Sequence, residues 1–324
     1  MLRRTALLIA ASAATLLAHA QQPAAKHGGE PWPTHPVRLL VGFPGGSSPD
    51  LTARLLAKAL GQPVIVENRP GASGNIATDM VAKSTDGHTL GLLINGNLTI
   101  AKLLNPRTPY DPLKDLTPIS LIGSAPLVLV ASNSVAFKDV PGFLASARKA
   151  GDQWSYGSPG IGTVSHLGME LLAMQTGIKA VHVPYPGNPQ VINGILAGEL
   201  QLALLPPGLA LPQIQAGRFK AVGLSSKGRS TLAPGVPSLA EGGVKDYQVE
   251  VWNAVAGPAD MPRERAQHLA NLINDILRRP EIREKMAAQG WQLIAGSPEA
   301  LRLRMQTDSE LMGSVIRARN ISID

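Results

Sequence analysis

From residue 37 onward, short aliphatic runs alternate with longer amphipathic stretches, and this alternation constrains the fold more than any other feature. A strand followed by a helix, repeated along a chain, is typical of a mostly parallel sheet covered by helices. The sequence therefore predicts an α/β fold. The aliphatic runs predict strands at Val37–Val41, Val64–Glu67, Thr89–Ile94, Ile119–Ala131, Ala180–His182, Gln201–Leu205, Lys220–Leu224 and Val249–Ala256.

The amphipathic stretches predict the intervening helices. Asp50 can cap a helix over Leu51–Leu60. A second helix contains Val164 in its apolar face and stops at Gly177, a residue that favours the left-handed conformation at helix ends. The last helix is expected to begin at Ser297, where a serine precedes a proline.

Two segments suggest that the chain crosses between two domains. Ile119–Ala131 is long for a strand and carries small residues and a proline in its middle, and Gln248–Pro258 resembles it much later in the chain. A chain that enters a second domain and returns needs two such crossings. We therefore expect a discontinuous first domain (residues 37–123 plus 253–324), an inserted second domain (124–252), and a ligand cleft between them.

The N-terminus predicts export. Arg3 and Arg4 precede an apolar run from Ala6 to Ala18, and a small-x-small motif ends at Ala20, so residues 1–20 are predicted to be a signal peptide cleaved near Ala20. The apolar run is shorter than the roughly 20 residues of a membrane span. Polar, proline-broken residues then predict a flexible lead-in over 21–36. The mature chain should be periplasmic.

Charge and cysteine content exclude several functions. The 324 residues carry 30 basic and 23 acidic side chains, a formal charge of +7, but lysine and arginine never run beyond two in a row. This dispersal does not favour a nucleic-acid partner. With no cysteine, the chain has no thiol nucleophile and no cysteine-ligated metal. The histidines are scattered without ligand spacing, so we expect no metal and no cofactor.

The common catalytic motifs are absent, and glycine-rich turns remain as candidate sites. The chain has no nucleophile elbow, zinc-protease motif, phosphate-binding loop or dinucleotide-binding motif. Gly42–Asp50 joins a predicted strand to a predicted helix, so its amide N–H groups and the helix N-terminus can hold an anion without arginine or lysine. A tight turn is the simpler interpretation, but two glycines and two serines exceed what a turn needs.

Four further turns extend the candidate site. Glu67–Asn75 and Asn95–Asn97 can simply turn the chain, whereas Tyr156–His166 offers amides and hydroxyls from the second domain, and Val183–Gly187 holds a tyrosine between prolines. Trp252 is expected to pack in the crossing strand rather than stack on a ligand. The predicted ligand-binding residues are Phe43, Pro44, Gly45, Gly46, Ser47, Ser48, Asn95, Ser158, Gly160, Gly162, Thr163, His166, Pro184, Tyr185 and Gly187.

Together these motifs resemble the Bug family, the TctC-like extracytoplasmic solute receptors of tripartite tricarboxylate transporters. The most specific match is Val64–Ile76 (VIVENRPGASGNI), and the opening loop also matches over Val41–Asp50. Further matches are Pro109–Ile119, Gly162–Leu167, His182–Tyr185 and Pro234–Gly242.

The resemblance implies a periplasmic-binding-protein fold of the type II-like kind, with two α/β lobes joined by two crossing strands. It also implies that the lobes close on a small carboxylate, which Phe43–Ser48 grips while Gly160–His166 and Val183–Gly187 face it. The implied partners are the ligand and the transmembrane permease subunits of a tripartite tricarboxylate transporter. We expect a monomer and no catalysis.

The chain departs from the family pattern at three places. Pro44-Gly-Gly-Ser47 stands where relatives often read Pro-Pro-Gly-Gly, Pro186 stands where they often carry lysine, and Leu205 stands where they often carry aspartate. An apolar Leu205 cannot accept a hydrogen bond. The ligand therefore stays open among dicarboxylates, tricarboxylates, amino acids and related organic acids.

Two other functions compete with the transport receptor. A receptor of this kind can instead feed a signalling kinase, which the sequence alone does not distinguish. A secreted serine hydrolase would use Ser158 or Ser165 with His166, but neighbours on one helix do not point together and no acid is placed to orient the imidazole. A lone histidine such as His166 is also well explained as a packed or capping residue.

Overall fold

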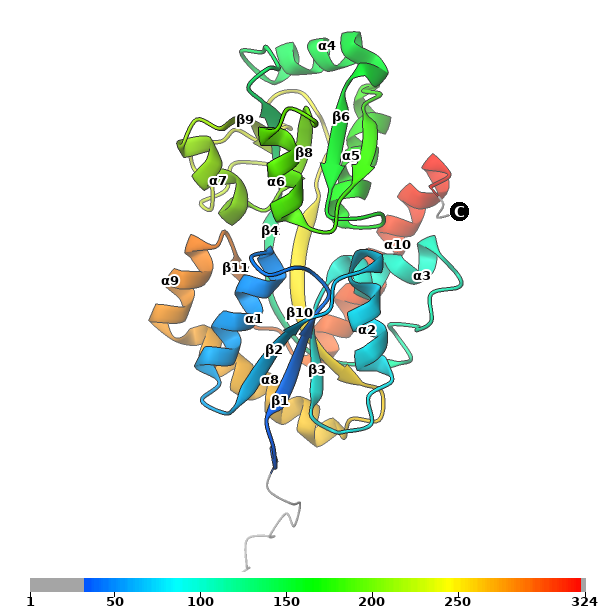
Figure 1. Ribbon diagram of the computed structural model, residues 1–324, viewed down its shortest axis with the longest axis vertical. Helices are drawn as coiled ribbons and strands as arrows, with labels where there is room; N and C mark the ends of the chain where they lie inside the picture. The colour runs from blue at the N-terminus through cyan, green and yellow to red at the C-terminus, as the bar shows by residue number, and fades with distance from the viewer. Residues whose placement is uncertain (1–31, 322–324) are drawn as a thin grey trace, which may run out of the picture. The chain divides into compact units, whose positions relative to one another are not determined.

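The structure is a computed structural model, and it describes residues 32–321 apart from the side chain of Arg319. The chain divides after Thr34, and the second unit, His35–Asp324, is compact. The second unit contains two β-sheets, each accompanied by helices, as Figure 1 shows. It therefore consists of two α/β lobes, and the predicted fold class is confirmed.

The first lobe is built on a six-stranded mixed sheet. Its strands are β1 (Val37–Val41), β2 (Val64–Asn68), β3 (Thr89–Ile94), β4 (Leu116–Pro126), β10 (Glu250–Pro258) and β11 (Gln292–Leu293). They lie in the order β11-β4-β10-β3-β1-β2. β1 pairs in parallel with β2 and β3, whereas β10 runs antiparallel to both β3 and β4. The parallel half of this sheet therefore directs the turns after β1 and β3 to one edge.

The second lobe is built on a five-stranded mixed sheet. Its strands are β5 (Val128–Ser132), β6 (Ser155–Ser158), β7 (Val181–Pro184), β8 (Leu202–Leu205) and β9 (Phe219–Leu224). They lie in the order β7-β6-β8-β5-β9. β6 is parallel to β7 and β8, while β5 is antiparallel to β8 and β9.

Helices follow most strands of both sheets (Figure 1). In the first lobe they are α1 (Ser48–Ala59), α2 (Asn75–Ala82), α3 (Ala101–Leu104), α8 (Arg263–Arg278), α9 (Pro280–Ala288) and α10 (Pro298–Arg319). In the second lobe they are α4 (Val140–Ala150), α5 (Val164–Thr176), α6 (Asn188–Leu196) and α7 (Pro207–Gln215). The long helix α10 packs on β4 and also contacts α5.

β4 and β10 are the two crossing strands. They pair with each other from one end to the other, with two register shifts, and β10 is the yellow strand in the centre of Figure 1. The prediction of one strand over Ile119–Ala131 is wrong, because the run is split between β4 and β5, which belong to different sheets. The break has a local cause. Pro126 has no amide hydrogen, and the N–H of Leu127 donates to Ser225 Oγ at 2.7 Å rather than to a strand.

The exact limits of the two lobes in the sequence stay a prediction. The proposed boundaries, between residues 123 and 124 and between 252 and 253, both fall inside strands of the first sheet. The predicted signal peptide (1–20) lies outside the described residues, as does most of the predicted lead-in (21–36).

The helix ends follow their sequence signals with one exception. α1 begins with Ser47 as its N-cap, so the prediction that Asp50 caps this helix is wrong: Asp50 lies inside the first turn. α5 begins after Thr163, whose hydroxyl accepts from the N–H of His166, and ends at Gly177 in the left-handed conformation. Ser297 caps α10, as predicted.

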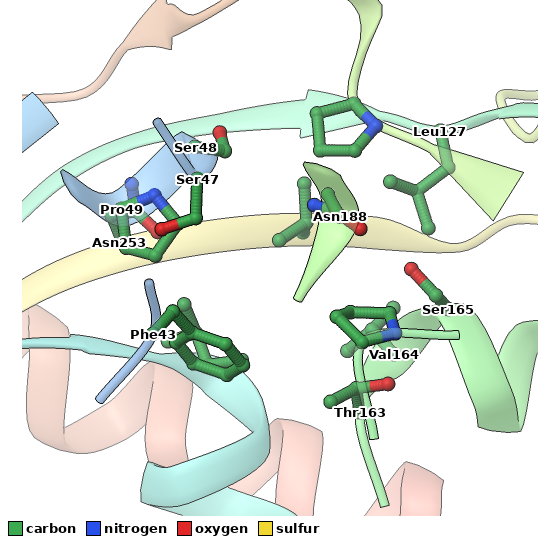
Figure 2. Close-up of a pocket in the computed structure, with 14 residues that line it drawn as sticks. Phe43, Ser47, Ser48, Pro49, Leu127, Thr163, Val164, Ser165, Asn188 and Asn253 are labelled. Atoms are coloured by element: carbon green, nitrogen blue, oxygen red, sulfur yellow. The ribbon is translucent and has the colours of Figure 1, made fainter. Parts of the chain in front are cut away.

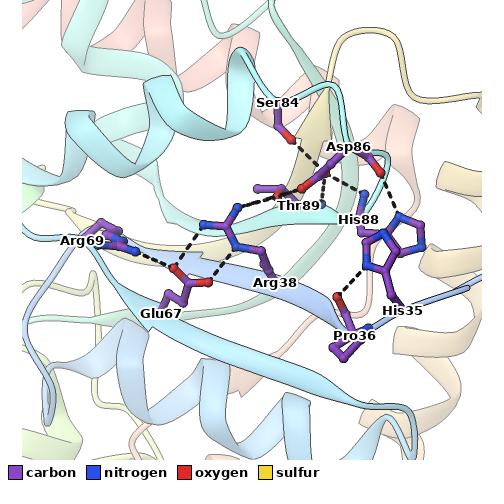
Figure 3. Close-up of polar contacts among 9 residues, drawn as sticks. All are labelled: His35, Pro36, Arg38, Glu67, Arg69, Ser84, Asp86, His88 and Thr89. Atoms are coloured by element: carbon purple, nitrogen blue, oxygen red, sulfur yellow. Dashed lines mark hydrogen bonds and ion pairs between the residues drawn. The ribbon is translucent and has the colours of Figure 1, made fainter.

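A network of ion pairs ties β1 to its neighbours and includes the glutamate of the VENRPG motif (Figure 3). Arg38 on β1 donates twice to Glu67 on β2, at 2.7 and 3.1 Å, and Arg69 donates to the same carboxylate at 2.8 Å. The hydrogen bond from Arg38 is the largest reason that the pKa of Glu67 falls to about 2. Asp86 accepts from the backbone and side chain of Thr89 on β3. Glu67 therefore holds strands together, and its oxygens are not free for a ligand.

Candidate functional site

Asn68 holds the loop between β1 and α1 in place. Asn68 donates to the carbonyl of Phe43 and to Asp50 Oδ1, both at 2.9 Å. Burial raises the pKa of Asp50, but hydrogen bonds from Arg54, Gly46 and Asn68 outweigh this effect, so its pKa lies below the usual value. The asparagine of the VENRPG motif thus positions the first loop rather than contacting a ligand itself.

Two amides of this loop are already used within the chain. The N–H of Gly46 donates to Asp50 Oδ2 at 2.9 Å, and the N–H of Ser47 donates to the carbonyl of Pro44 at 3.2 Å. These two N–H groups are therefore not open to an anion. The predicted role of the loop in ligand binding depends on its other N–H groups, on the start of α1 and on the Ser47 hydroxyl, which forms no cap hydrogen bond.

A small pocket lies between this loop and the second lobe (Figure 2). The space between its lining side chains is about 30 Å³, which is room for one or two water molecules. No lysine, arginine, histidine, aspartate or glutamate lines it. Its lining residues are Phe43, Ser47, Ser48, Pro49, Ile94, Leu127, Pro159, Thr163, Val164, Ser165, Asn188, Pro206, Val251 and Asn253.

Four helix N-termini meet at this pocket. α1 contributes Ser47 and Ser48, α5 contributes its cap Thr163 and first residues, α6 contributes its first residue Asn188, and α7 contributes its N-cap Pro206. Each helix start carries a partial positive charge and unpaired N–H groups. The pocket therefore favours an anion although no cationic side chain lines it.

Three buried polar atoms in the pocket wall have no hydrogen-bond partner among residues 32–321. They are Ser47 Oγ, Asn188 Oδ1 and Asn253 Oδ1, and the exposed fractions of these residues are 1, 6 and 1%. A buried polar atom without a partner costs about 1–3 kcal/mol. Three of them around one pocket indicate a site built for a polar occupant.

The two lobes touch around the rim of the pocket through glycines. A β-carbon on Gly187 would lie 2.9 Å from the ring of Pro44, and one on Gly96 would lie 3.2 Å from the carbonyl of Gly162. A β-carbon on Gly160 would overlap Ser73, which itself has a positive φ of 56°. These contacts leave no space for side chains at the three glycines, so the two lobes approach closely beside the pocket.

Ser158 and His166 lie behind the pocket wall. Ser158 Oγ is 2.7 Å from His182 Nε2, and His182 stacks on His166 with ring centroids 4.0 Å apart. The N–H of Gly162 donates to His166 Nδ1 at 3.2 Å. These contacts stiffen the loop between β6 and α5, which supports the packing interpretation of His166.

A serine–histidine pair is therefore present, but it is not the pair considered from sequence. Ser158 is fully buried, and its partner is His182 rather than His166. The nearby Glu170 accepts a hydrogen bond from Tyr156. Ser158 does not line the pocket, so this geometry does not place a nucleophile before a substrate.

The buried histidines predict a pH dependence of stability. Burial lowers the pKa of both His166 and His182 below 6.5, and the neighbouring imidazole lowers that of His182 further. Below pH 6.5 the unfolded chain therefore binds protons that the folded chain does not, so the free energy of unfolding falls by up to about 1.4 kcal/mol per pH unit for each histidine. Urea denaturation between pH 7.5 and 4.5 should show this loss.

The matched variants for this test are His182→Gln and His268→Gln. The first should flatten the pH profile, because glutamine keeps a hydrogen bond to Ser158 without binding a proton. The second changes an exposed histidine and should leave the profile unchanged. A profile of His182→Gln as steep as that of the wild type would contradict the assignment.

The structure divides the predicted ligand-binding residues into three groups. Those that line the pocket are Phe43, Ser47, Ser48 and Thr163. A second, open cavity lies at the rim and is also lined by Gly71–Ser73. The predicted residues that line it are Gly160, Pro184 and Tyr185. Those that line neither cavity are Pro44, Gly45, Gly46, Asn95, Ser158, Gly162, His166 and Gly187.

The predicted list omits three polar lining residues, Ser165, Asn188 and Asn253, and most of the apolar ones. Asn188 follows directly on the predicted Val183–Gly187 turn, and Asn253 is a polar residue within the apolar crossing segment, so both carried a visible signal. Leu127 and Val251 reach the pocket from the crossing segments. Leu205 is fully buried in the core of the second lobe and does not line the pocket, whereas Pro186 lines the rim cavity.

Two features are absent from the described residues, 32–321. They contain no cluster of three or more histidine, aspartate or glutamate side chains that could hold a metal ion. Within the same range, no helix combines the length and apolarity needed to cross a bilayer.

Known proteins resemble this chain over nearly its whole length. The model of the tripartite tricarboxylate transporter family receptor matches residues 51–321. Protein BugT of Bordetella pertussis is 32% identical over 292 residues, covering 88% of this chain and 90% of BugT. The structure of the periplasmic binding protein BugD superposes with a TM-score of 0.84 at 27% identity, over 90% of this chain and 99% of BugD.

Two solved neighbours contain organic acids. An R. palustris protein solved with adipate has a TM-score of 0.87 and 28% identity, over 90% of this chain and 99% of that protein. MatC from Rhodopseudomonas palustris with bound malate has a TM-score of 0.83 and 27% identity, over 88% of this chain and 100% of MatC. These neighbours confirm the predicted periplasmic-binding-protein fold.

Proposed function

The chain belongs to the family of tripartite tricarboxylate transporter receptors, and on this premise we propose that it captures a small carboxylate in the pocket between its lobes. The observation that carries the proposal is the meeting of four helix N-termini at a pocket without charged side chains. A carboxylate can accept hydrogen bonds from several such N–H groups at once. No formal positive charge is then needed.

The charge balance of the first loop also supports an anionic ligand. Asp50 lies in the first turn of α1, where its own negative charge would repel a carboxylate. Arg54 pairs with Asp50 at 3.0 Å and compensates that charge. The N-terminus of α1 therefore stays available to the ligand.

Adipate and malate, found with two of the solved neighbours, are both dicarboxylates. They support a small organic acid as the ligand class of this chain. We expect the signal peptide to be cleaved and the mature receptor to act in the periplasm. There the closed, ligand-bound receptor should deliver its ligand to a transmembrane permease. We also expect it to act as a monomer and without catalysis.

Closure is the functional step that this geometry supports. The pocket is nearly filled, so the ligand must enter while the lobes are apart and be enclosed as they come together. Enclosure excludes water and strengthens the hydrogen bonds to the carboxylate. A ligand that binds both lobes thereby selects the closed conformation.

Thermal unfolding tests the proposal. A carboxylate that binds the folded chain at a hundredfold excess over its Kd should stabilise it by about 2.7 kcal/mol, seen as a higher Tm. Ser165→Asp should abolish the shift, because it places a fixed anion in the pocket at the start of α5. The exposed replacement Ser314→Asp is its control. A panel of carboxylates without effect, together with a shift from a neutral sugar or a metal ion, would refute the proposal.

A further inference from the structure

Thr52 orients the side-chain amide of Asn253. Thr52 Oγ1 donates to the carbonyl of Ser48 at 3.2 Å. In the same network it accepts from Asn253 Nδ2, which lies 3.2 Å away. The NH₂ group of Asn253 consequently faces Thr52, and its carbonyl oxygen Oδ1 is left in the pocket wall without a donor.

A second carbonyl oxygen and a hydroxyl lie in the same wall. Asn188 Oδ1, at the start of α6, and Ser47 Oγ are both buried in this wall (Figure 2). Neither atom has a hydrogen-bond partner among the described residues. A carbonyl oxygen can only accept hydrogen bonds. The pocket thus presents helix N–H donors and, beside them, two acceptors that no group of the described residues satisfies.

An ionised carboxylate alone cannot complete this pocket, because it has no hydrogen to donate to Asn253 or Asn188. A hydroxyl or an ammonium of the ligand can supply the hydrogen directly, in place of the one or two water molecules for which the pocket has room. An ammonium would be buried without a carboxylate in the lining and beside four helix N-termini, whose partial charges repel a cation. A hydroxyl donates without carrying charge.

We infer that the ligand is a small hydroxycarboxylate whose hydroxyl donates to Asn253 while its carboxylate lies at the helix N-termini. This inference rests on the proposed function and adds the second functional group of the ligand. Asn253 is then a specificity residue, and Asn188 assists it from the opposite lobe.

Matched pairs of acids that differ by one hydroxyl test the inference. Isothermal titration calorimetry should be run with lactate against propionate and with malate against succinate. In the pair whose carbon skeleton fits the pocket, the hydroxylated member should bind about tenfold tighter or more, because its partner leaves the acceptors unsatisfied. Alanine and aspartate, which carry an ammonium in place of the hydroxyl, should bind more weakly than lactate and malate.

The variant Asn253→Leu tests the residue itself. It keeps a similar volume and removes the acceptor, so the preference for the hydroxylated member should shrink to within about threefold. The exposed replacement Asn271→Leu on α8 is the control and should keep the wild-type preference. A thermal melt of each variant establishes that it is folded. If Asn253→Leu does not fold, Asn188→Leu provides the same measurement on the other acceptor.

Each outcome has one meaning. Equal affinity of the wild type for both members of each pair, tighter binding of the amino acids, or an unchanged preference in Asn253→Leu would overturn this inference. Any of these results would leave carboxylate capture standing. If no acid of either kind binds, the proposed function itself fails.

Discussion

Replacing Gly208 with alanine should weaken carboxylate binding by about tenfold or more while the free protein stays folded. Gly208 lies in the first turn of α7 in the second lobe, and it packs against Gln289, which follows α9 in the first lobe. A β-carbon on Gly208 would overlap the backbone carbonyl of Gln289. Backbone cannot rotate away as a flexible side chain can. The two lobes would have to stay further apart, which penalises the closed conformation.

This substitution separates closure from ligand contact, because Gly208 does not line the pocket. Titration calorimetry should show the weaker affinity, and small-angle X-ray scattering should show a smaller ligand-induced compaction. The control is Gly235→Ala, at an exposed glycine with nothing within 4 Å of the new β-carbon. Wild-type affinity in Gly208→Ala would mean that binding does not require this contact between α7 and the turn after α9.

The sequence was sufficient for the elements whose pattern is local. β1 and β3 occupy the predicted residues, because mainly aliphatic runs of five or six residues between turns are too short for helices and fit buried strands. β6 was missed because Ser155–Ser158 contains a glycine and polar residues, and only its central place between β7 and β8 makes it a strand. The split between β4 and β5 was missed for a related reason. Pro126 allows a break within the run, but the partner that completes it, Ser225, lies about a hundred residues further along the chain.

Residues of the candidate site could be predicted where a single loop supplies them, but not where the pocket forms between the two lobes. Ser47 and Thr163 were identified because each precedes a helix in a glycine-rich turn. Gly46 and Gly187 were predicted to bind the ligand, but they do not line the pocket. The N–H of Gly46 donates to Asp50, and Gly187 lies in close contact with Pro44. Asn253 reaches the pocket from a crossing strand far along the chain, which no local motif reveals.

Replacing Trp252 with alanine should destabilise the protein by about 3–5 kcal/mol, the range for removing a large buried aromatic side chain. Trp252 is fully buried in the crossing strand β10, where it packs in the cluster that contains Leu301 and Met305 of α10. Its Nε1 donates to Asp308 Oδ2 at 2.6 Å. The residue therefore joins the crossing strand to α10 by both packing and a hydrogen bond.

The variant Trp252→Phe divides these two contributions. It retains most of the packing and loses only the hydrogen bond, and Asp308 keeps its pairing with Arg304 at 2.9 Å. A loss of about 1.5–3 kcal/mol is expected for a hydrogen bond to a charged group. Urea unfolding should thus order the proteins as wild type, phenylalanine variant, alanine variant. If both variants unfolded within about 1 kcal/mol of the wild type, Trp252 would not anchor the crossing strand. The coupling between β10 and α10 would then have to lie in the ion pair between Arg304 and Glu250 of β10, at 3.2 Å.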